Sequence, residues 1–283
     1  MNRSTFEFVK LQGLGNDYVF IDCLDRPLPP DPSDLARRVS DRHFGVGSDG
    51  LIAVLPGERA SLRMRMWNAD GSEGEMCGNG LRGFAKYVFE RGYVGDHAFD
   101  VETKAGVLRP EVLVEDGRVA RVRVDMGRPR FERGSLPMAG APDAPCIDET
   151  LSLGGAEVQV TCVSMGNPHC ILFVDDVATA PVTTLGPAIE IDPTFPRRVN
   201  VSFVAARGPR ELHMRVWERG SGETLACGTG ACAAAVAAAL TGRAERSVVV
   251  HLPGGPLEIE WSDHVLMTGP TVEVFRGVFF DPK

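Results

Sequence analysis

Two stretches of one pattern decide the fold: WNADGSEGEMCGNG at residues 67–80 and WERGSGETLACGTG at residues 217–230. Aligned at a constant offset of 150 residues (227 − 77), they share a Trp, a Glu and a Cys-Gly-X-Gly loop, in that order. With one further residue of offset, the Gly-Asn pair at 15–16 falls on the pair at 166–167. An ordered set of this kind predicts a duplicated chain, with two domains of similar plan.

Gly and Pro divide the rest of the chain into short strands and few helices. Strands are expected at residues 6–11, 18–22, 51–55, 62–67, 100–103, 106–114 and 119–126. Helices are expected at residues 35–41 and 81–90, with a counterpart of the second at 231–240. The stretch 127–145 is rich in Gly and Pro, which predicts a connection between the two domains.

Composition narrows the class of protein. The 283 residues are 43% hydrophobic and 24% charged, as in an ordinary globular protein. The net charge of −8 and the lack of a Lys/Arg cluster argue against a nucleic-acid partner. The first ten residues lack the apolar core of a signal peptide, and the most apolar stretch, 231–240, is too short to cross a bilayer. We therefore expect a cytoplasmic protein with no membrane partner.

The cysteines are expected to be free thiols in a reducing compartment, because there are seven of them and no pair has the C-x-x-C spacing. Five are expected to be buried packing residues: Cys23, Cys146, Cys162, Cys170 and Cys232. The other two, Cys77 and Cys227, each open a Cys-Gly-X-Gly loop that is followed by an expected helix.

That position suits acid–base chemistry. Unpaired N–H groups and a partial positive charge at a helix N-terminus can hold a carboxylate and favour a thiolate. Glycines let the backbone approach a ligand closely. Two such loops around one α-carbon could remove a proton from one face and return it on the other, without a metal or an organic cofactor. The alternative for either cysteine is an inert buried thiol among glycine turns.

At these loops the chain resembles the diaminopimelate epimerases. The resemblance extends to GLGND at 13–17, GVGSDG at 45–50, MGNPH at 165–169 and RVN at 198–200, in family order. It implies two pseudo-symmetric α/β (α+β) domains, each a mostly antiparallel or mixed sheet wrapped around a central helix, with the active site in the cleft between them. The implied domains are residues 1–126 with 272–283, carrying Cys77, and residues 127–271, carrying Cys227. It also implies a homodimer.

The implied activity is epimerisation of LL-2,6-diaminopimelate to the meso isomer, in lysine and peptidoglycan-precursor biosynthesis, without pyridoxal phosphate or another cofactor. Cys77 and Cys227 would be the acid–base pair, with Cys77 the base toward the LL isomer. His169 and Glu218 would tune the thiols. The substrate would be bound by two groups of residues: the loop amides of Gly78, Asn79, Gly228 and Thr229, and the side chains of Asn16, Asn68, Asn167, Asn200, Glu218 and Arg219.

The chain departs from the family pattern at one position, and several alternative functions remain open. Some relatives carry Gln where this chain has Gly50, so a side-chain contact there is absent. Gly45, Gly47 and Gly50 match a dinucleotide-binding pattern, but a helix precedes them and a strand follows, which is the reverse of that motif. No ligand spacing indicates a metal site, and the other five histidines are read as structural. The rival functions are a related two-cysteine racemase for another amino acid, a binding protein that has lost catalysis, and a redox-sensing thiol protein.

Overall fold

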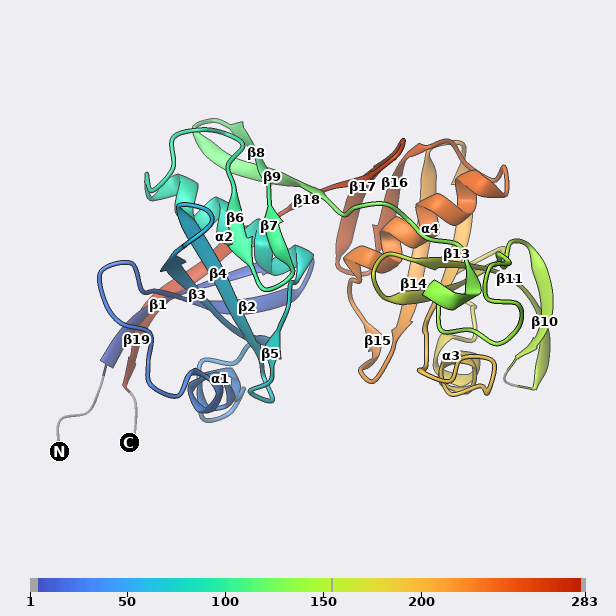
Figure 1. The fold of residues 1–283 in the computed structure, drawn as a ribbon, viewed down its shortest axis with the longest axis horizontal. Coiled ribbons are helices and arrows are strands. Elements are labelled where there is room, and N and C mark those ends of the chain that lie inside the picture. Colours follow the sequence, from blue (N-terminus) through green and yellow to red (C-terminus); the bar gives the residue numbers. More distant parts are fainter. Residues whose placement is uncertain (1–4, 154, 281–283) are drawn as a thin grey trace. The chain divides into compact units, whose positions relative to one another are not determined.

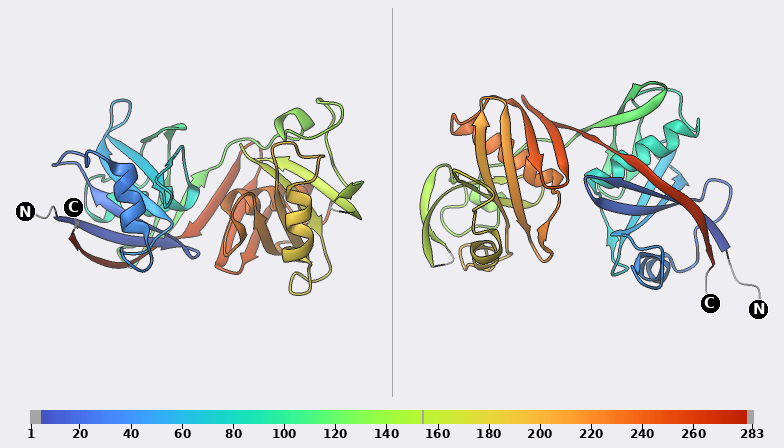
Figure 2. Two further views of the ribbon diagram at one scale, coloured as in Figure 1. Left: turned by 90° about the horizontal axis from the view of Figure 1, so that it is seen from below. Right: turned by 180° about the vertical axis from the view of Figure 1, so that it is seen from behind.

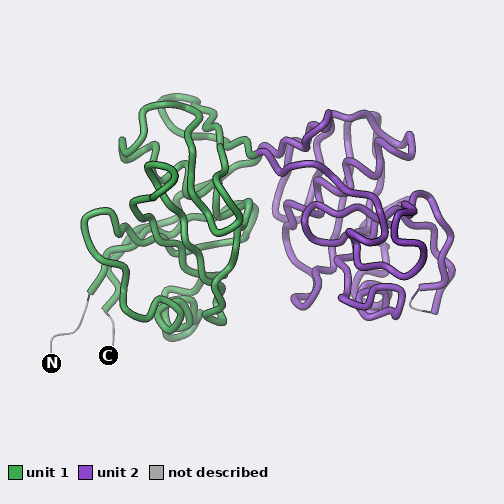
Figure 3. Tube along the Cα trace, viewed as in Figure 1, with its two compact units in different colours: residues 1–124, 269–283 green, residues 125–268 purple. Residues whose placement is uncertain are grey.

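The computed structural model describes residues 5–153 and 155–280. The chain forms two compact units, which Figure 3 colours separately: residues 1–124 with 269–283 (unit 1), and residues 125–268 (unit 2). The divisions expected from the sequence lay after residue 126 and after residue 271. Both units are dominated by sheet with few helices, which confirms the expected α+β class. Within the described ranges, none of the helices has the length and apolar character needed to cross a membrane.

Unit 1 is built on a sheet with the strand order β19-β1-β2-β3-β4-β6-β7, and β5 pairs with β4 (Figure 1). The β2/β3 and β4/β6 pairs are parallel, and the others in this sheet are antiparallel. Its elements are β1 (Thr5–Gly13), β2 (Asn16–Asp22), α1 (Pro32–Ser40), β3 (Gly50–Pro56), β4 (Leu62–Asn68), β5 (Glu73–Gly74), α2 (Gly78–Glu90), β6 (Val101–Thr103), β7 (Gly106–Leu108), the hairpin β8 (Glu111–Glu115) and β9 (Arg118–Asp125), and β19 (Val272–Phe280).

Unit 2 repeats this plan. Its strands run in the order β10-β11-β12-β13-β14-β16-β17-β18, with β15 paired to β14, and β12/β13 and β14/β16 are again the parallel pairs. Its elements are β10 (Glu149–Leu153), β11 (Ala156–Ser164), β12 (Pro168–Phe173), α3 (Val182–Glu190), β13 (Asn200–Gly208), β14 (Glu211–Glu218), β15 (Gly222–Thr224), α4 (Gly228–Leu240), β16 (Ser247–Leu252), β17 (Gly255–Trp261) and β18 (Val265–Pro270), with a short 3-10 turn at Arg133–Ser135. The matched order and pairing confirm the predicted duplication.

A buried helix lies at the centre of each unit. In unit 2, α4 contacts β11, β12, β13, β14, β16 and β17, and Figure 2 shows it lying along these strands. Every residue from Gly230 to Ala238 is buried. A helix enclosed on all sides needs small side chains, which explains its run of alanines. In unit 1, α2 contacts β1, β2, β3 and β8. Its buried Lys86 pairs with Glu90 at 2.7 Å and donates to the carbonyl of Val119 at 2.7 Å, which ties β9 to the helix.

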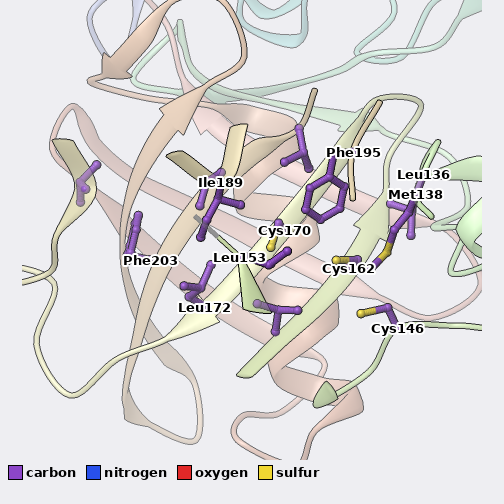
Figure 4. Close-up of a cluster of buried hydrophobic side chains, with 14 residues drawn as sticks. Leu136, Met138, Cys146, Leu153, Cys162, Cys170, Leu172, Ile189, Phe195 and Phe203 are labelled. Carbon is purple, nitrogen blue, oxygen red and sulfur yellow. The ribbon is translucent and has the colours of Figure 1, made fainter. Parts of the chain in front are cut away.

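A second core in unit 2 lies between α3 and the sheet, as Figure 4 shows. It includes Cys146, Cys162 and Cys170, which are buried as predicted, as are Cys23 and Cys232. It also contains Leu136 and Met138, which are 0% and 7% exposed. The interpretation of residues 127–145 as a connection between domains was therefore wrong. The segment belongs to unit 2, because its few apolar side chains complete that core.

Other expectations were wrong at their boundaries. The strand expected over 106–114 is broken between β7 and β8, where Pro110 lacks the N–H group that a ladder requires. The helix expected at 35–41 starts at Pro32, because Asp31 caps it with a 2.9 Å bond from the amide of Asp34. The central helices begin at Gly78 and Gly228 rather than at 81 and 231, so the glycines of both loops are helical.

Candidate active site

Both candidate catalytic cysteines are the N-cap residues of the central helices. Cys77 precedes α2 with φ of −136° and ψ of 123°, and Cys227 precedes α4 with φ of −130° and ψ of 107°. This shared extended conformation places each thiol at the first turn of its helix. In α2 the amide of Gly80 donates to the Cys77 sulfur at 3.5 Å. Each sulfur thus lies at the positive end of a helix dipole, beside amides without helical partners.

The second glycine of each loop packs closely against a side chain of the sheet. A Cβ on Gly80 would lie 2.8 Å from Cδ1 of Ile52, and one on Gly230 would lie 2.9 Å from Cε of Met214 and 3.2 Å from the sulfur of Cys227. The helix therefore starts so close to the sheet that only glycine fits without displacing a neighbour. The two Cys-Gly-X-Gly loops fix the distance of the thiols from their sheets.

In unit 1, Asn16 and Asn79 lie beside Cys77. The Cys77 thiol donates to Oδ1 of Asn16 at 3.7 Å, and the Asn79 amide donates to the same oxygen at 3.3 Å. Asn16 is held in turn by Asp49, whose carboxylate accepts its amide at 2.7 Å. Asn79 accepts a 2.5 Å bond from the guanidinium of buried Arg82. Three of the predicted site residues therefore form one fixed cluster.

Tyr18 also belongs to this cluster, although it is not among the residues predicted from the sequence. Its side chain is buried, and its hydroxyl has Cys77 and Asn16 as hydrogen-bonding neighbours. Burial raises the pKa of the Tyr18 phenol well above its usual value, and the adjacent Cys77 thiol raises it further. Tyr18 stays a neutral hydroxyl beside the sulfur. Alternation along β2 puts Tyr18 and Asn16 on the same face, and that signal could have identified it.

Gly50 lies next to Tyr18 across the β2/β3 ladder. A Cβ at Gly50 would lie 2.9 Å from the Tyr18 ring and 2.2 Å from the Trp67 carbonyl oxygen. The tyrosine ring therefore fills space that a side chain at this position would need. Asn68, the partner of Gly50 on β4, is exposed, and its amide donates to Ser72 at 2.9 Å. The structure gives Asn68 no contact with Cys77.

In unit 2, a hydrogen-bonded chain leads from the helix to the sheet. The Cys227 sulfur lies 3.6 Å from the Thr229 hydroxyl, which accepts the Asn167 amide at 3.2 Å. Oδ1 of Asn167 lies 3.1 Å from Nε2 of His169. Burial, with the nearby charge of Arg219, lowers the pKa of His169 to about 3. His169 is therefore neutral at physiological pH and orients Asn167, rather than acting as a charged group.

Glu218 lies beside Cys227. Burial raises the pKa of the Cys227 thiol, and the Glu218 carboxylate raises it further. Glu218 accepts the Thr224 hydroxyl at 2.5 Å, which orients it from β15. A buried sulfur next to a carboxylate keeps its proton, so Cys227 is a thiol in this structure. Burial and Glu218 raise this pKa by more than the hydrogen bonds from Thr229 and from the Gly230 amide lower it, whereas the sequence predicts a lowered pKa at this position.

Hydrogen bonds between side chains and backbone groups hold Asn200 and Arg219 in place. Asn200 donates to the Pro168 carbonyl at 2.9 Å and accepts the Arg219 amide at 2.9 Å. The Arg219 guanidinium donates to the Arg197 carbonyl at 3.2 Å. Glu190, at the end of α3, accepts the Trp217 indole at 2.7 Å and the Gly220 amide at 2.9 Å. Glu190 thus fixes both sides of the Glu218–Arg219 turn, although no motif in the sequence marks it.

The chain is similar in sequence to one family of known proteins. The sequence model of the family described as diaminopimelate epimerase matches residues 8–132 and 161–274. Diaminopimelate epimerases from Moorella thermoacetica and Heliobacterium modesticaldum are 59% and 52% identical to the chain, each over 96% of this chain and 98% of that protein.

Solved structures share the fold at low sequence identity. A phenazine biosynthesis protein of the PhzF family from Bacillus anthracis has a TM-score of 0.71 at 17% identity, covering 98% of this chain and 99% of that one. A hydroxyproline epimerase from Agrobacterium vitis has a TM-score of 0.69 at 15% identity, covering 98% and 94%. At such identities these similarities establish the fold alone.

Proposed function

The chain belongs to the diaminopimelate epimerase family, and from this premise we propose that it interconverts LL- and meso-2,6-diaminopimelate by a two-base mechanism without a cofactor. One observation carries the mechanism: Cys77 and Cys227 are N-cap residues at equivalent positions of a duplicated fold. Inversion of a stereocentre needs one proton acceptor and one proton donor on opposite faces. The duplication supplies one thiol in each unit for these two roles.

The surroundings of the two cysteines suggest which one starts as the protonated thiol and which one as the thiolate. Cys227 is buried beside Glu218 and carries its proton, so it acts as the acid toward the LL isomer. Cys77 acts as the base: its thiolate takes the α-proton, and the electron pair of the broken C–H bond passes into the carboxylate as an enediolate. The Cys227 proton then adds to the opposite face of the α-carbon. The reaction ends with the protonation states exchanged, ready for the reverse direction.

The α-proton of an amino acid is a very weak acid, so the enediolate must be stabilised. We assign this to the amides at the helix N-termini, those of Gly78 and Asn79 in α2 and of Gly228 and Thr229 in α4. These donors are already oriented and cost no reorganisation when negative charge develops. The ammonium groups and the distal carboxylate of the substrate would be bound by the remaining polar side chains, which are those of Asn16, Asn68, Asn167, Asn200, Glu218 and Arg219.

A homodimer is part of the proposal. Strand β19 is one of the two edge strands of the unit 1 sheet. Its exposed apolar side chains are Val272, Val274, Phe275, Val278 and Phe280. An apolar edge of this kind favours pairing with another chain, and a second copy of this chain is the partner that the family resemblance implies. A cytoplasmic location also belongs to the proposal, because both thiols must stay reduced.

The deciding experiment incubates reduced protein with LL-diaminopimelate in deuterated water and follows meso isomer and α-deuterium. We expect inversion with deuterium gain in the wild type and its loss in Cys77→Ala and Cys227→Ala. Cys232→Ala, farther along α4, is the control and should remain active. Exchange with another amino acid but not with this one would indicate a related racemase. A folded, reduced protein without exchange on any amino acid would refute the proposal in favour of a binding protein.

A further inference from the structure

Three side chains that the proposed reaction does not use come together on the outer face of unit 2. Glu211 and His213 are two residues apart on β14 and therefore project from the same face. His251 on β16 is the register partner of His213 in the parallel β14/β16 ladder. The residue between the first two, Leu212, is buried on the opposite face. Sequence spacing does not indicate this cluster, because the two histidines are far apart along the chain.

The three groups are close enough to share one ligand. Oε1 of Glu211 lies 2.9 Å from Nε2 of His213 and 3.8 Å from Nε2 of His251. One nitrogen from each ring and a carboxylate oxygen all lie within 4.8 Å of one another. The side chains are 50%, 38% and 42% exposed, respectively, so solvent and ions can reach them.

We propose that Glu211, His213 and His251 form a binding site for a divalent transition-metal cation of the zinc type, with water completing the coordination. Two imidazole nitrogens and one carboxylate oxygen are a donor set that zinc binds in proteins. Tetrahedral ligands at about 2.0–2.1 Å from the metal lie about 3.3 Å apart. The Glu211–His213 and Glu211–His251 distances of 2.9 and 3.8 Å lie on either side of this spacing, and all three ligand atoms lie within 4.8 Å of one another, so side-chain rotations can bring them to one metal ion. Calcium and magnesium prefer all-oxygen sites and do not fit.

The position of the site suggests what a bound metal would do. The β14/β16 ladder has only three register pairs among the described residues, and His213–His251 is the last of them. The neighbouring β16/β17 ladder has six. A metal held by residues of both strands would clamp this short junction in the unit 2 sheet. Binding to the folded state alone raises the temperature of unfolding as metal is added.

The test is a titration of the reduced, full-length protein with ZnCl₂, followed by calorimetry and by thermal unfolding. We expect one site per chain and a rise in the unfolding midpoint. His213→Gln and His251→Gln should each weaken binding by at least about tenfold, since losing even an outer-shell partner of a metal costs about 10–100-fold. The control is His264→Gln, since His264 is an exposed histidine of the same unit, hydrogen-bonded to Asp125 at 2.8 Å, and it should bind as the wild type does.

Cobalt(II) distinguishes this site from the cysteines. Ligation by nitrogen and oxygen gives weak visible bands, whereas thiolate ligation adds an intense sulfur-to-metal charge-transfer band in the near ultraviolet. We expect visible bands without the charge-transfer band, and their loss in both histidine variants. A charge-transfer spectrum that survives in both variants, equal zinc affinity in all proteins, or no binding by the wild type would each overturn the proposal.

Discussion

At the scale of single residues, the two thiols differ in their surroundings. Cys227 is 6% exposed and lies beside Glu218, whereas Cys77 is partly exposed. Alkylation requires an accessible thiolate. Burial, with the Glu218 charge, raises the pKa of Cys227, so its thiolate forms only at higher pH. Iodoacetamide at neutral pH should therefore modify Cys77 well before Cys227, as measured by peptide mass spectrometry over time. Equal rates, or faster modification of Cys227, would contradict this assignment of acid and base.

The Tyr18 hydroxyl allows a second prediction at this scale. Tyr18→Phe removes the hydroxyl beside Cys77 and keeps the ring that packs against Gly50. One hydrogen bond contributes about 0.5–1.5 kcal/mol, so kcat/KM should fall about 2- to 10-fold. The unfolding temperature should change little. Tyr87→Phe is the control, since its hydroxyl donates to Asp22 at 3.1 Å, away from the thiol. Equal losses in both variants would show that the Tyr18 hydroxyl is merely structural.

Glu190 gives a prediction that depends on pH. Burial alone would raise its pKa, but hydrogen bonds from Trp217 and Gly220, with the charge of Arg198, outweigh burial and lower it. A carboxyl whose pKa is lowered by folding stabilises the protein above its unfolded pKa of about 4.3 and loses this contribution as pH falls through the folded value. Glu190→Gln should be less stable than the wild type at pH 7, by urea unfolding, and the difference should shrink below about pH 4. A difference that is independent of pH would contradict this account.

At the scale of elements, the start of α4 is set by packing rather than by helix propensity. Ala is a better helix former than Gly, yet a Cβ at Gly230 would press on Met214 and on the sulfur of Cys227. Gly230→Ala should therefore cost about 1–3 kcal/mol of stability, as overpacked sites do, and should lower kcat by displacing the thiol. Gly208→Ala is the control, because nothing lies within 4 Å of its Cβ position. A stable, fully active Gly230→Ala enzyme would show that the close packing has no function.

The sequence predicts elements well where local patterns decide them. Alternation identified β4, and the repeated loops identified both cysteines and the glycines beside them. Prediction from the sequence failed where contacts between residues far apart in the chain decide the structure. The burial of Leu136 depends on a core assembled from other strands, and the first turns of α2 and α4 are glycine-rich, with helical structure supported by packing against the sheets. Tyr18 shares a strand face with Asn16, so alternation could have identified it, whereas Glu190 comes from helix α3 and its partners Trp217 and Gly220 could not be read from sequence spacing.

At the scale of the whole molecule, the edge strands β19 of unit 1 and β10 of unit 2 differ in character. In unit 1 the edge strand β19 exposes large apolar side chains, with Phe275 44% and Val278 48% exposed. In unit 2 the edge strand β10 is short, and its residues Glu149 and Thr150 are polar. An exposed apolar edge is a liability unless it is covered. For the proposed homodimer, this contrast favours a contact through unit 1.

The last prediction follows from that contrast. The double variant Phe275→Asp/Val278→Asp places charges on the β19 edge, where burial in an interface would be costly. We expect the wild type to have the mass of a dimer by light scattering, and the variant to have that of a folded monomer by light scattering and circular dichroism. Val107→Asp, on the exposed face of β7, is the control and should stay dimeric, because Val107 is 43% exposed but lies on another strand. A dimeric double variant would place the interface elsewhere, and a monomeric wild type would refute the dimer itself. Because both half-sites lie within one chain, activity that survives in a monomeric variant would show that dimerisation supports stability rather than supplying catalytic groups.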